Sequence, residues 1–187
     1  MFSQIPMKWF MFILITVVLL AVCYLPAGLQ KKEEQGQMRA AYHAAESTRS
    51  NMADSLASFA ETLIGTPYNY GCAKPESGFD CSGFITYVFS NFNLHVPRSS
   101  VDFTHLGREI PEKEARRGDL ILFTGTDPNI RVVGHMGIIT SNTDSLRFIH
   151  STSGRESAVT ITGLNDHYRN RFMKVIRVFD NRGNLVL

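Results

Sequence analysis

A cysteine at the start of an apolar run supplies a potential nucleophile. Asp80-Cys81-Ser82 precedes apolar residues at helical spacing, so Asp80 predicts an N-cap and Cys81 falls in the first helical turn. His135 and His150 follow in two short runs of strand-like composition. Covalent acyl transfer by a thiol needs a nucleophile, a base and a group that orients the base. The sequence therefore predicts Cys81 as nucleophile, with the two histidines as its partners.

The position of Cys81 favours its activation. A free cysteine thiol has a pKa near ~8.5, and a helix N-terminus or a cationic neighbour lowers that value. Unpaired backbone N–H groups and the positive end of the helix dipole meet at the first turn. We therefore expect a lowered pKa at Cys81. A buried structural cysteine is the alternative, and the polar Asp-Cys-Ser-Gly setting disfavours it.

The two histidines are predicted to share one face of a β-hairpin. A turn centred between Thr143 and Asp144 places His135 opposite Thr152, two residues from His150. Diagonal neighbours on one face are within reach of ring side chains. A turn one residue longer or shorter would put the rings on opposite faces. In the favoured register, His150 can hydrogen-bond one nitrogen of His135 and leave the other for the thiol.

The other cysteines and the charge balance exclude several classes. Cys23, Cys72 and Cys81 form neither a disulfide framework nor a zinc site, because they are few and contain no CxxC pair. A Cys72–Cys81 disulfide that blocks the nucleophile is one hypothesis, and an unpaired Cys72 thiol is favoured over it. We expect no metal and no cofactor. The 19 basic and 17 acidic residues of the 187-residue chain do not suggest a nucleic-acid partner.

The N-terminal segment is apolar on every face. From Trp9 to Leu29 the chain carries no charge, and lysines flank this run. A retained membrane anchor is favoured, with a cleaved secretory signal and lipidation at Cys23 as alternatives. Each of these would send the following domain across a membrane. The sequence thus divides into an anchor or signal (1–30), a polar tether (31–51) and a domain (52–187).

Hydrophobic periodicity predicts helices first and strands afterwards. An amphipathic helix is expected over Met52–Ile64, ended by Gly65, and a second helix follows Asp80. Together they predict an α+β domain, with helices packed on one side of an antiparallel sheet and a hydrophobic N-terminal helix in front. The expected strands are Leu120–Phe123, Val132–Thr140, Arg147–Ser151 and Met173–Phe179.

Four ordered motifs carry a specific resemblance. They are Asp-Cys-Ser-Gly-Phe (80–84), Gly-Asp-Leu-Ile-Leu-Phe (118–123), Gly-His-Met-Gly-Ile (134–138) and Phe-Ile-His (148–150). In their order and spacing the chain resembles the NlpC family of bacterial cell-wall cysteine peptidases, over roughly residues 55–179. Gly-Thr-Pro-Tyr (65–68) and Val-Pro-Arg-Ser-Ser (96–100) are similar to further family landmarks.

This resemblance implies a fold, an activity and roles for residues. The family has a papain-like α+β fold and cleaves peptide stems of peptidoglycan, commonly between D-γ-glutamate and a diamino acid. Carried over by position, Cys81 is the nucleophile, His135 the general base and acid, and His150 the group that orients it. The remaining implied site residues are Tyr68, for the oxyanion or substrate, and Asp80 and Ser82, for substrate recognition.

Other functions use the same residues. An amidase or acyl transferase needs the same three groups, and a catalytically silent cell-wall scaffold is the non-enzyme alternative. The expected partners are peptidoglycan stem peptides and, through the N-terminal segment, the membrane. The expected state is a monomer in the cell envelope, either membrane-anchored or exported.

The remaining histidines and Arg98 are predicted to lie outside the chemistry of the site. His95, His105 and His167 are expected in polar surface loops. Arg98 is expected to hold a loop carbonyl or a carboxylate.

Overall fold

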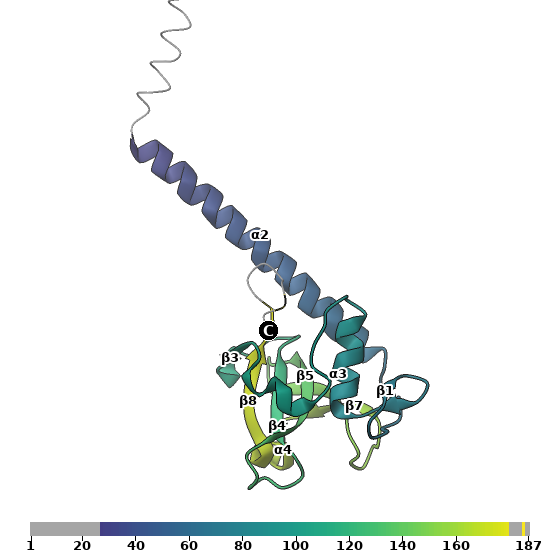
Figure 1. Ribbon diagram of the computed structural model, residues 1–187. Helices are drawn as coiled ribbons and strands as arrows, with labels where there is room; N and C mark the ends of the chain where they lie inside the picture. Colours follow the sequence, from purple (N-terminus) through teal and green to yellow (C-terminus); the bar gives the residue numbers. More distant parts are fainter. Residues whose placement is uncertain (1–26, 180–184, 186–187) are drawn as a thin grey trace, which may run out of the picture. The chain divides into compact units, whose positions relative to one another are not determined.

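The computed structural model describes residues 27–179 and residue 185 (Figure 1). The anchor or signal predicted for residues 1–30 lies outside these residues, except for its last four positions. Within residues 27–179, no helix is both long enough and apolar enough to cross a membrane.

The first described element is the helix α2, Ala27–Glu61. The chain divides into two compact units, and the boundary between Ala44 and Ala45 falls within this helix. The predicted helix over Met52–Ile64 is the last part of α2, which ends at Glu61 and continues as a turn to Gly65. Gly65 has a φ of 89°, a conformation that favours glycine. The helix buries Leu56, Ala57 and Ala60 in the core of the second unit.

The helix α3, Cys81–Ser90, begins where the sequence predicts it. Asp80 is its N-cap and accepts a 2.6 Å hydrogen bond from the backbone N–H of Gly83. A short hairpin, β1 (Ala73–Lys74) and β2 (Gly78–Phe79), precedes it. Gly83 lies so close to this hairpin that a Cβ there would be 2.1 Å from the Cys72 carbonyl oxygen.

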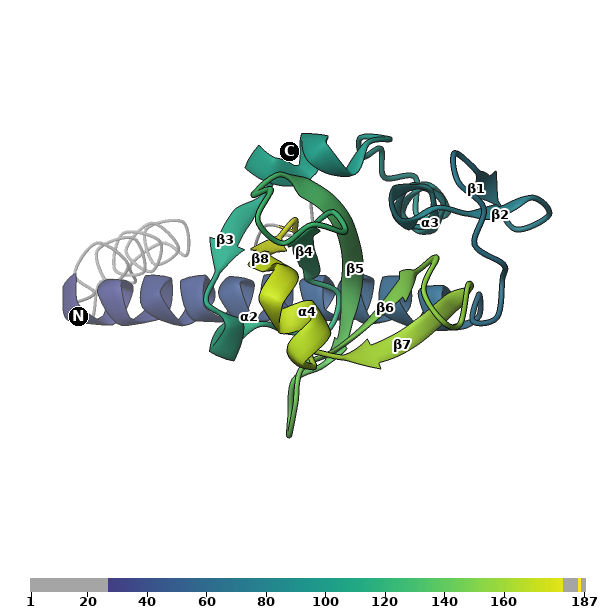
Figure 2. The same ribbon diagram turned by 90° about the horizontal axis from the view of Figure 1, so that it is seen from below.

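Six strands form one sheet in the order β3-β8-β4-β5-β6-β7, and every neighbouring pair is antiparallel (Figure 2). Two 3₁₀ helices, η1 (Ser100–His105) and η2 (Glu112–Glu114), flank the first strand. The strands are β3 (Arg108–Ile110), β4 (Leu120–Thr124), β5 (Val133–Ser141), β6 (Arg147–Ser151), β7 (Val159–Gly163) and β8 (Phe172–Arg177). The four strands predicted from sequence are confirmed to within two residues at each end.

Both faces of the sheet are covered, which corrects the prediction of helices on one side only. Leu120 and Leu122 of β4 pack with α3 and the end of α2. Ile121 and Phe123 point to the opposite face and pack with Tyr168. Tyr168 belongs to a short helix, α4 (Asp166–Arg171), which the sequence did not predict. The domain is therefore α+β, with helices against a six-stranded antiparallel sheet.

Candidate active site

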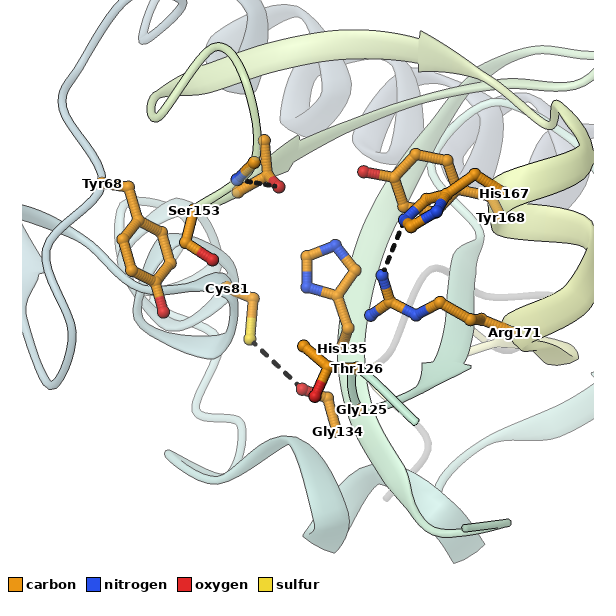
Figure 3. A pocket seen from close by; sticks show the side chains of 12 residues that line it. Tyr68, Cys81, Gly125, Thr126, Gly134, His135, Ser153, His167, Tyr168 and Arg171 are labelled. Carbon is orange, nitrogen blue, oxygen red and sulfur yellow. Dashed lines mark hydrogen bonds between the residues drawn. The ribbon is translucent and has the colours of Figure 1, made fainter. Parts of the chain in front are cut away.

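A cleft opens at the N-terminus of α3, and its two parts share Tyr68, Cys81 and Gly134. The part of about 300 Å³ is lined by residues that include His135 and Arg171, and we call it the His135 side. The part of about 460 Å³ is lined by residues that include Asp80, Ser82 and Arg98, and we call it the Asp80 side. Figure 3 shows the Cys81 sulfur and the His135 ring at the same opening. The prediction that the Cys81 thiol and the His135 imidazole share one cleft is thus confirmed.

Cys81 stands in the first turn of α3, with its Sγ 3.9 Å from the carbonyl oxygen of Gly134. The backbone N–H groups of Cys81 and Ser82 act on the sulfur and lower its pKa, as does Arg98. Burial and the neighbouring Asp80 carboxylate act in the opposite direction and dominate, so the pKa of Cys81 is raised. The expected lowering of this pKa is therefore wrong, because the helix terminus does not outweigh desolvation.

His135 and His150 are joined by a 2.8 Å hydrogen bond between Nε2 of His135 and Nδ1 of His150. Ile138 pairs with Ile149 across β5 and β6, the register that a turn between Thr143 and Asp144 produces. The register predicted for the histidines is therefore confirmed, whereas nearer the turn the pairing shifts by one residue, to Ser141 with Arg147.

Gly137 makes room for this pair of rings. A Cβ at Gly137 would lie 2.8 Å from the Ile149 carbonyl oxygen and 3.2 Å from the Cβ of His150. A larger residue there would push β6 away from β5. The glycine two residues after His135 thus lets β5 and β6 lie close together where the two histidines meet.

The second histidine continues the chain of hydrogen bonds into the sheet. Nε2 of His150 is 3.0 Å from Oγ1 of Thr162 on β7. For Nδ1 of His135 to accept a proton in the cleft, Nε2 of His135 must donate to His150, and Nε2 of His150 must donate to Thr162. This assignment of tautomers follows from the hydrogen-bond partners. Three neighbouring strands therefore orient one basic nitrogen toward the cleft.

Tyr168 covers both histidine rings. Its ring is stacked on His135 at 6.2 Å and meets His150 edge-on at 5.3 Å. His150 is fully buried, and His135 is 8% exposed. Burial is the main cause that lowers the pKa of both histidines, and the positive charge of Arg171 lowers it further. The pKa of His150 falls to about 3, and the pKa of His135 falls well below 6.5. The resting site thus contains neutral imidazoles beside a protonated thiol.

Asp80 and Ser82 are held by Arg98 on the Asp80 side of the cleft. The Arg98 guanidinium donates to both carboxylate oxygens of Asp80, at 2.9 and 2.7 Å, and to the Ser82 hydroxyl at 3.0 Å. Burial raises the pKa of Asp80, but Arg98 and the N–H groups of Gly83 and Gly71 outweigh it, so the pKa is lowered. Arg98 holds a carboxylate as predicted.

Tyr68 lines both parts of the cleft. Burial raises the pKa of its hydroxyl, and the charges of Cys81 and Asp80 raise it further, against a hydrogen bond with Ser153. The hydroxyl therefore stays protonated and able to donate in the cleft. Figure 3 shows Tyr68 and Ser153 on the same side of Cys81.

Comparison with known proteins identifies the fold family. Residues 65–178 match the model of the NlpC/P60 family. The chain belongs to this family. The NlpC/P60 resemblance expected from the four motifs is thereby confirmed, together with its papain-like α+β fold.

Several NlpC/P60 relatives are endopeptidases by name. A probable endopeptidase NlpC homolog of Haemophilus influenzae is 33% identical over 145 residues, which cover 75% of this chain and 72% of the relative. The gamma-DL-glutamyl hydrolase of Bacillus subtilis is 35% identical over 123 residues, 65% of this chain but 28% of the relative. A Bacillus cereus NlpC/P60 crystal structure aligns with a TM-score of 0.59 at 28% identity, covering 67% of this chain and 39% of that one. This chain thus spans less than half of the two Bacillus proteins.

The NlpC/P60 cleft also contains residues that sequence reasoning missed. His167, expected in a surface loop, lies in α4 and lines the His135 side with Tyr168 and Arg171. Asn165 caps this helix by accepting from the Tyr168 N–H, and an asparagine before a polar turn was the available signal. Thr162 lies in a β-branched alternating run that is typical of a strand. Cys72 and Cys81 are both free thiols.

Proposed function

We propose that this protein is a cysteine endopeptidase that hydrolyses peptide stems of bacterial peptidoglycan. One observation carries the proposal: Cys81 and His135 line the same cleft, and His135 is held by His150, in a domain of the NlpC/P60 family. The names of the relatives support the substrate, since they include a murein DD-endopeptidase of Escherichia coli, 32% identical over 112 residues.

The neutral resting site defines the first step. Nδ1 of His135 removes the thiol proton as the Cys81 sulfur bonds to the amide carbonyl carbon, and the carbonyl π electrons move to oxygen. The backbone N–H groups of Cys81 and Ser82, together with the Tyr68 hydroxyl, are the donors available to that oxyanion. Because both pKa values oppose a resting ion pair, proton transfer accompanies attack.

The second step releases the amine and then the acid. The His135 imidazolium protonates the leaving nitrogen as the C–N bond breaks, which yields a thioester at Cys81. Water then gives a proton to His135, attacks the thioester and frees the carboxylic acid, and the proton returns to the thiolate. His150 keeps His135 in one orientation throughout, and Asp80 and Ser82 with Arg98 form the recognition surface opposite.

The scissile bond that we propose joins D-γ-glutamate to a diamino acid. The gamma-DL-glutamyl hydrolase and the bifunctional muramidase/DL-endopeptidase CwlT of Bacillus subtilis, 35% and 38% identical to this chain over the matched residues, support it. We place the enzyme in the cell envelope as a monomer. Residues 1–30 would export or anchor it, residues 31–51 would tether it, and residues 52–187 would carry the activity.

The test is product analysis with defined peptidoglycan stem peptides. The purified full chain should release the fragment that begins with the diamino acid, as found by mass spectrometry. Cys81→Ala should abolish release, and the matched variant Cys72→Ala should retain it, because Cys72 lies outside both parts of the cleft. Binding without product would favour a scaffold, acyl exchange without net hydrolysis would favour a transferase, and cleavage at a D-Ala bond would refute the bond assignment.

A further inference from the structure

We propose that Arg171 binds a carboxylate on the leaving-group half of the substrate. This inference rests on the proposed endopeptidase function and specifies which stem peptides the cleft accepts. It starts from a cation in the cleft wall that the reaction itself does not use.

Arg171 enters the cleft from the end of α4. It lines the His135 side, with Cys81 and His135 (Figure 3). Its Nη1 is 3.1 Å from Nε2 of His167, and its Nη2 donates to the Thr124 carbonyl at 3.1 Å. Because a guanidinium only donates, Nε2 of His167 is the acceptor in this hydrogen bond.

The hydrogen-bonding and charge requirements of Arg171 are incompletely met. Its Nε is buried without a partner, the one such side-chain atom among the described residues. Within that same part of the chain, no carboxylate forms an ion pair with Arg171. Burial lowers the pKa of its guanidinium, because the charged form is partly desolvated in the cleft wall. An incoming anion would offset the cost of that desolvation.

The other arginine of the cleft differs in this respect. Arg98 donates to both oxygens of Asp80, so its charge is already matched. Asp102 lines the same Asp80 side and adds a negative charge. The cleft is therefore negative on the Asp80 side and positive on the His135 side, which favours a substrate with an anionic group beside His135.

The reaction determines which half of the substrate lies there. His135 gives its proton to the leaving nitrogen, so the leaving group must lie on the His135 side, where Arg171 stands. In the proposed bond the leaving group is a diamino acid. Diaminopimelate carries a carboxylate at its distal carbon that lysine lacks, and a guanidinium forms charge-assisted, bidentate hydrogen bonds with such a group. Arg171 would thus select stems with a free distal carboxylate.

The test uses two stem peptides that differ only at that group, one with diaminopimelate as the free acid and one with its distal carboxamide. At about neutral pH, the full wild-type chain should cleave the acid with a kcat/KM about 10- to 100-fold above that of the amide, mainly through KM. Arg171→Gln should erase this preference, so that the variant cleaves acid and amide with kcat/KM values within about twofold of each other. Arg171→Lys should retain part of the preference, because it keeps the charge without the planar fork.

Arg169→Gln is the matched control. Arg169 lies on the same helix, pairs with Glu112 and does not line the cleft, so this variant should keep the wild-type preference. Equal cleavage of acid and amide by wild type would overturn the inference and leave the endopeptidase function standing, as would an equal loss on both peptides in Arg171→Gln. Cleavage of neither peptide by wild type would overturn the proposed function and this inference with it.

Discussion

At the scale of single residues, the cleft keeps the Cys81 thiol and the His135 imidazole uncharged. Burial raises the pKa of Cys81 and lowers the pKa of His135, and Asp80 and Arg171 act in the same directions as burial. The sequence placed both residues correctly but could not supply the balance between a helix terminus and desolvation. Helix position follows from residue spacing, whereas desolvation depends on side chains such as Tyr168 that come from distant parts of the chain.

A prediction about thiol chemistry follows from this balance. The rate of Cys81 alkylation by iodoacetamide should rise with pH through a single step that lies above the pKa of an ordinary cysteine thiol, because burial raises the pKa of Cys81 and only the thiolate reacts. Mass spectrometry of the modified chain as a function of pH measures this rate. The experiment is done in the Cys72→Ala variant, so that Cys81 is the thiol of the domain that reacts. A fast reaction on a plateau between about pH 5 and 7 would instead reveal a resting thiolate–imidazolium pair and would contradict the neutral site.

At the scale of elements, the sequence predicted those with clear periodicity or a cap. The helix after Asp80 and the four core strands have long apolar patterns, and the structure confirms them. β3 has three residues, two of them exposed, and α4 has six residues with one buried side chain, so neither has a periodic signal. β7 alternates Val159, Ile161 with threonines and could have been recognised. Because α4 was missed, so were the places of His167, Tyr168 and Arg171 in the lining of the His135 side.

Contact between α3 and the β1–β2 hairpin sets the position of Cys81. Gly83→Ala should place its Cβ against the Cys72 carbonyl, where the backbone leaves 2.1 Å. The resulting shift should cost about 1–3 kcal/mol of unfolding free energy and should reduce kcat more than tenfold, because displacement of about 1 Å at a nucleophile costs about 100-fold.

Urea denaturation and stem-peptide cleavage would measure the two effects of Gly83→Ala. Gly163→Ala is the control, since a Cβ at Gly163 meets nothing within 4 Å and its φ is not positive. The control should change stability by less than about 1 kcal/mol and leave kcat unaltered. Wild-type activity in folded Gly83→Ala would show that this contact does not position the thiol.

At the scale of the whole domain, His135 and His150 belong to a core. The face of the sheet that carries His135 and His150 also carries Phe123 and Phe148, and Tyr168 of α4 packs against it. The rings of these three residues contact the imidazoles. The same packing that orients the His135 ring therefore links the site to global stability. Because the two buried histidines have lowered pKa values, the free energy of unfolding should depend on pH.

The free energy of unfolding should fall as the pH drops below about 6.5, the pKa of a histidine in the unfolded chain. The unfolded chain binds protons there, while folded His135 and His150 do so only at lower pH, with His150 near about 3. Each histidine contributes at most about 1.4 kcal/mol per pH unit, so the pair should cost about 2–3 kcal/mol between pH 6 and pH 5. Asp80 and Glu61, whose pKa values are lowered, add their loss only at more acidic pH.

The pH dependence of the unfolding free energy in a variant distinguishes the contribution of the two histidines from that of the rest of the domain. In His150→Asn, urea unfolding between pH 6 and pH 5 should give about half the pH dependence of wild type, whatever the absolute stability of the variant, because one of the two titrating groups is gone. Asparagine retains a polar group near the position of Nδ1, so the bond to His135 can persist. An unchanged slope would mean that His150 is protonated alike in the folded and unfolded chains. The buried relay from the cleft to Thr162 would then have to contain a charged imidazole, which the apolar rings around it oppose.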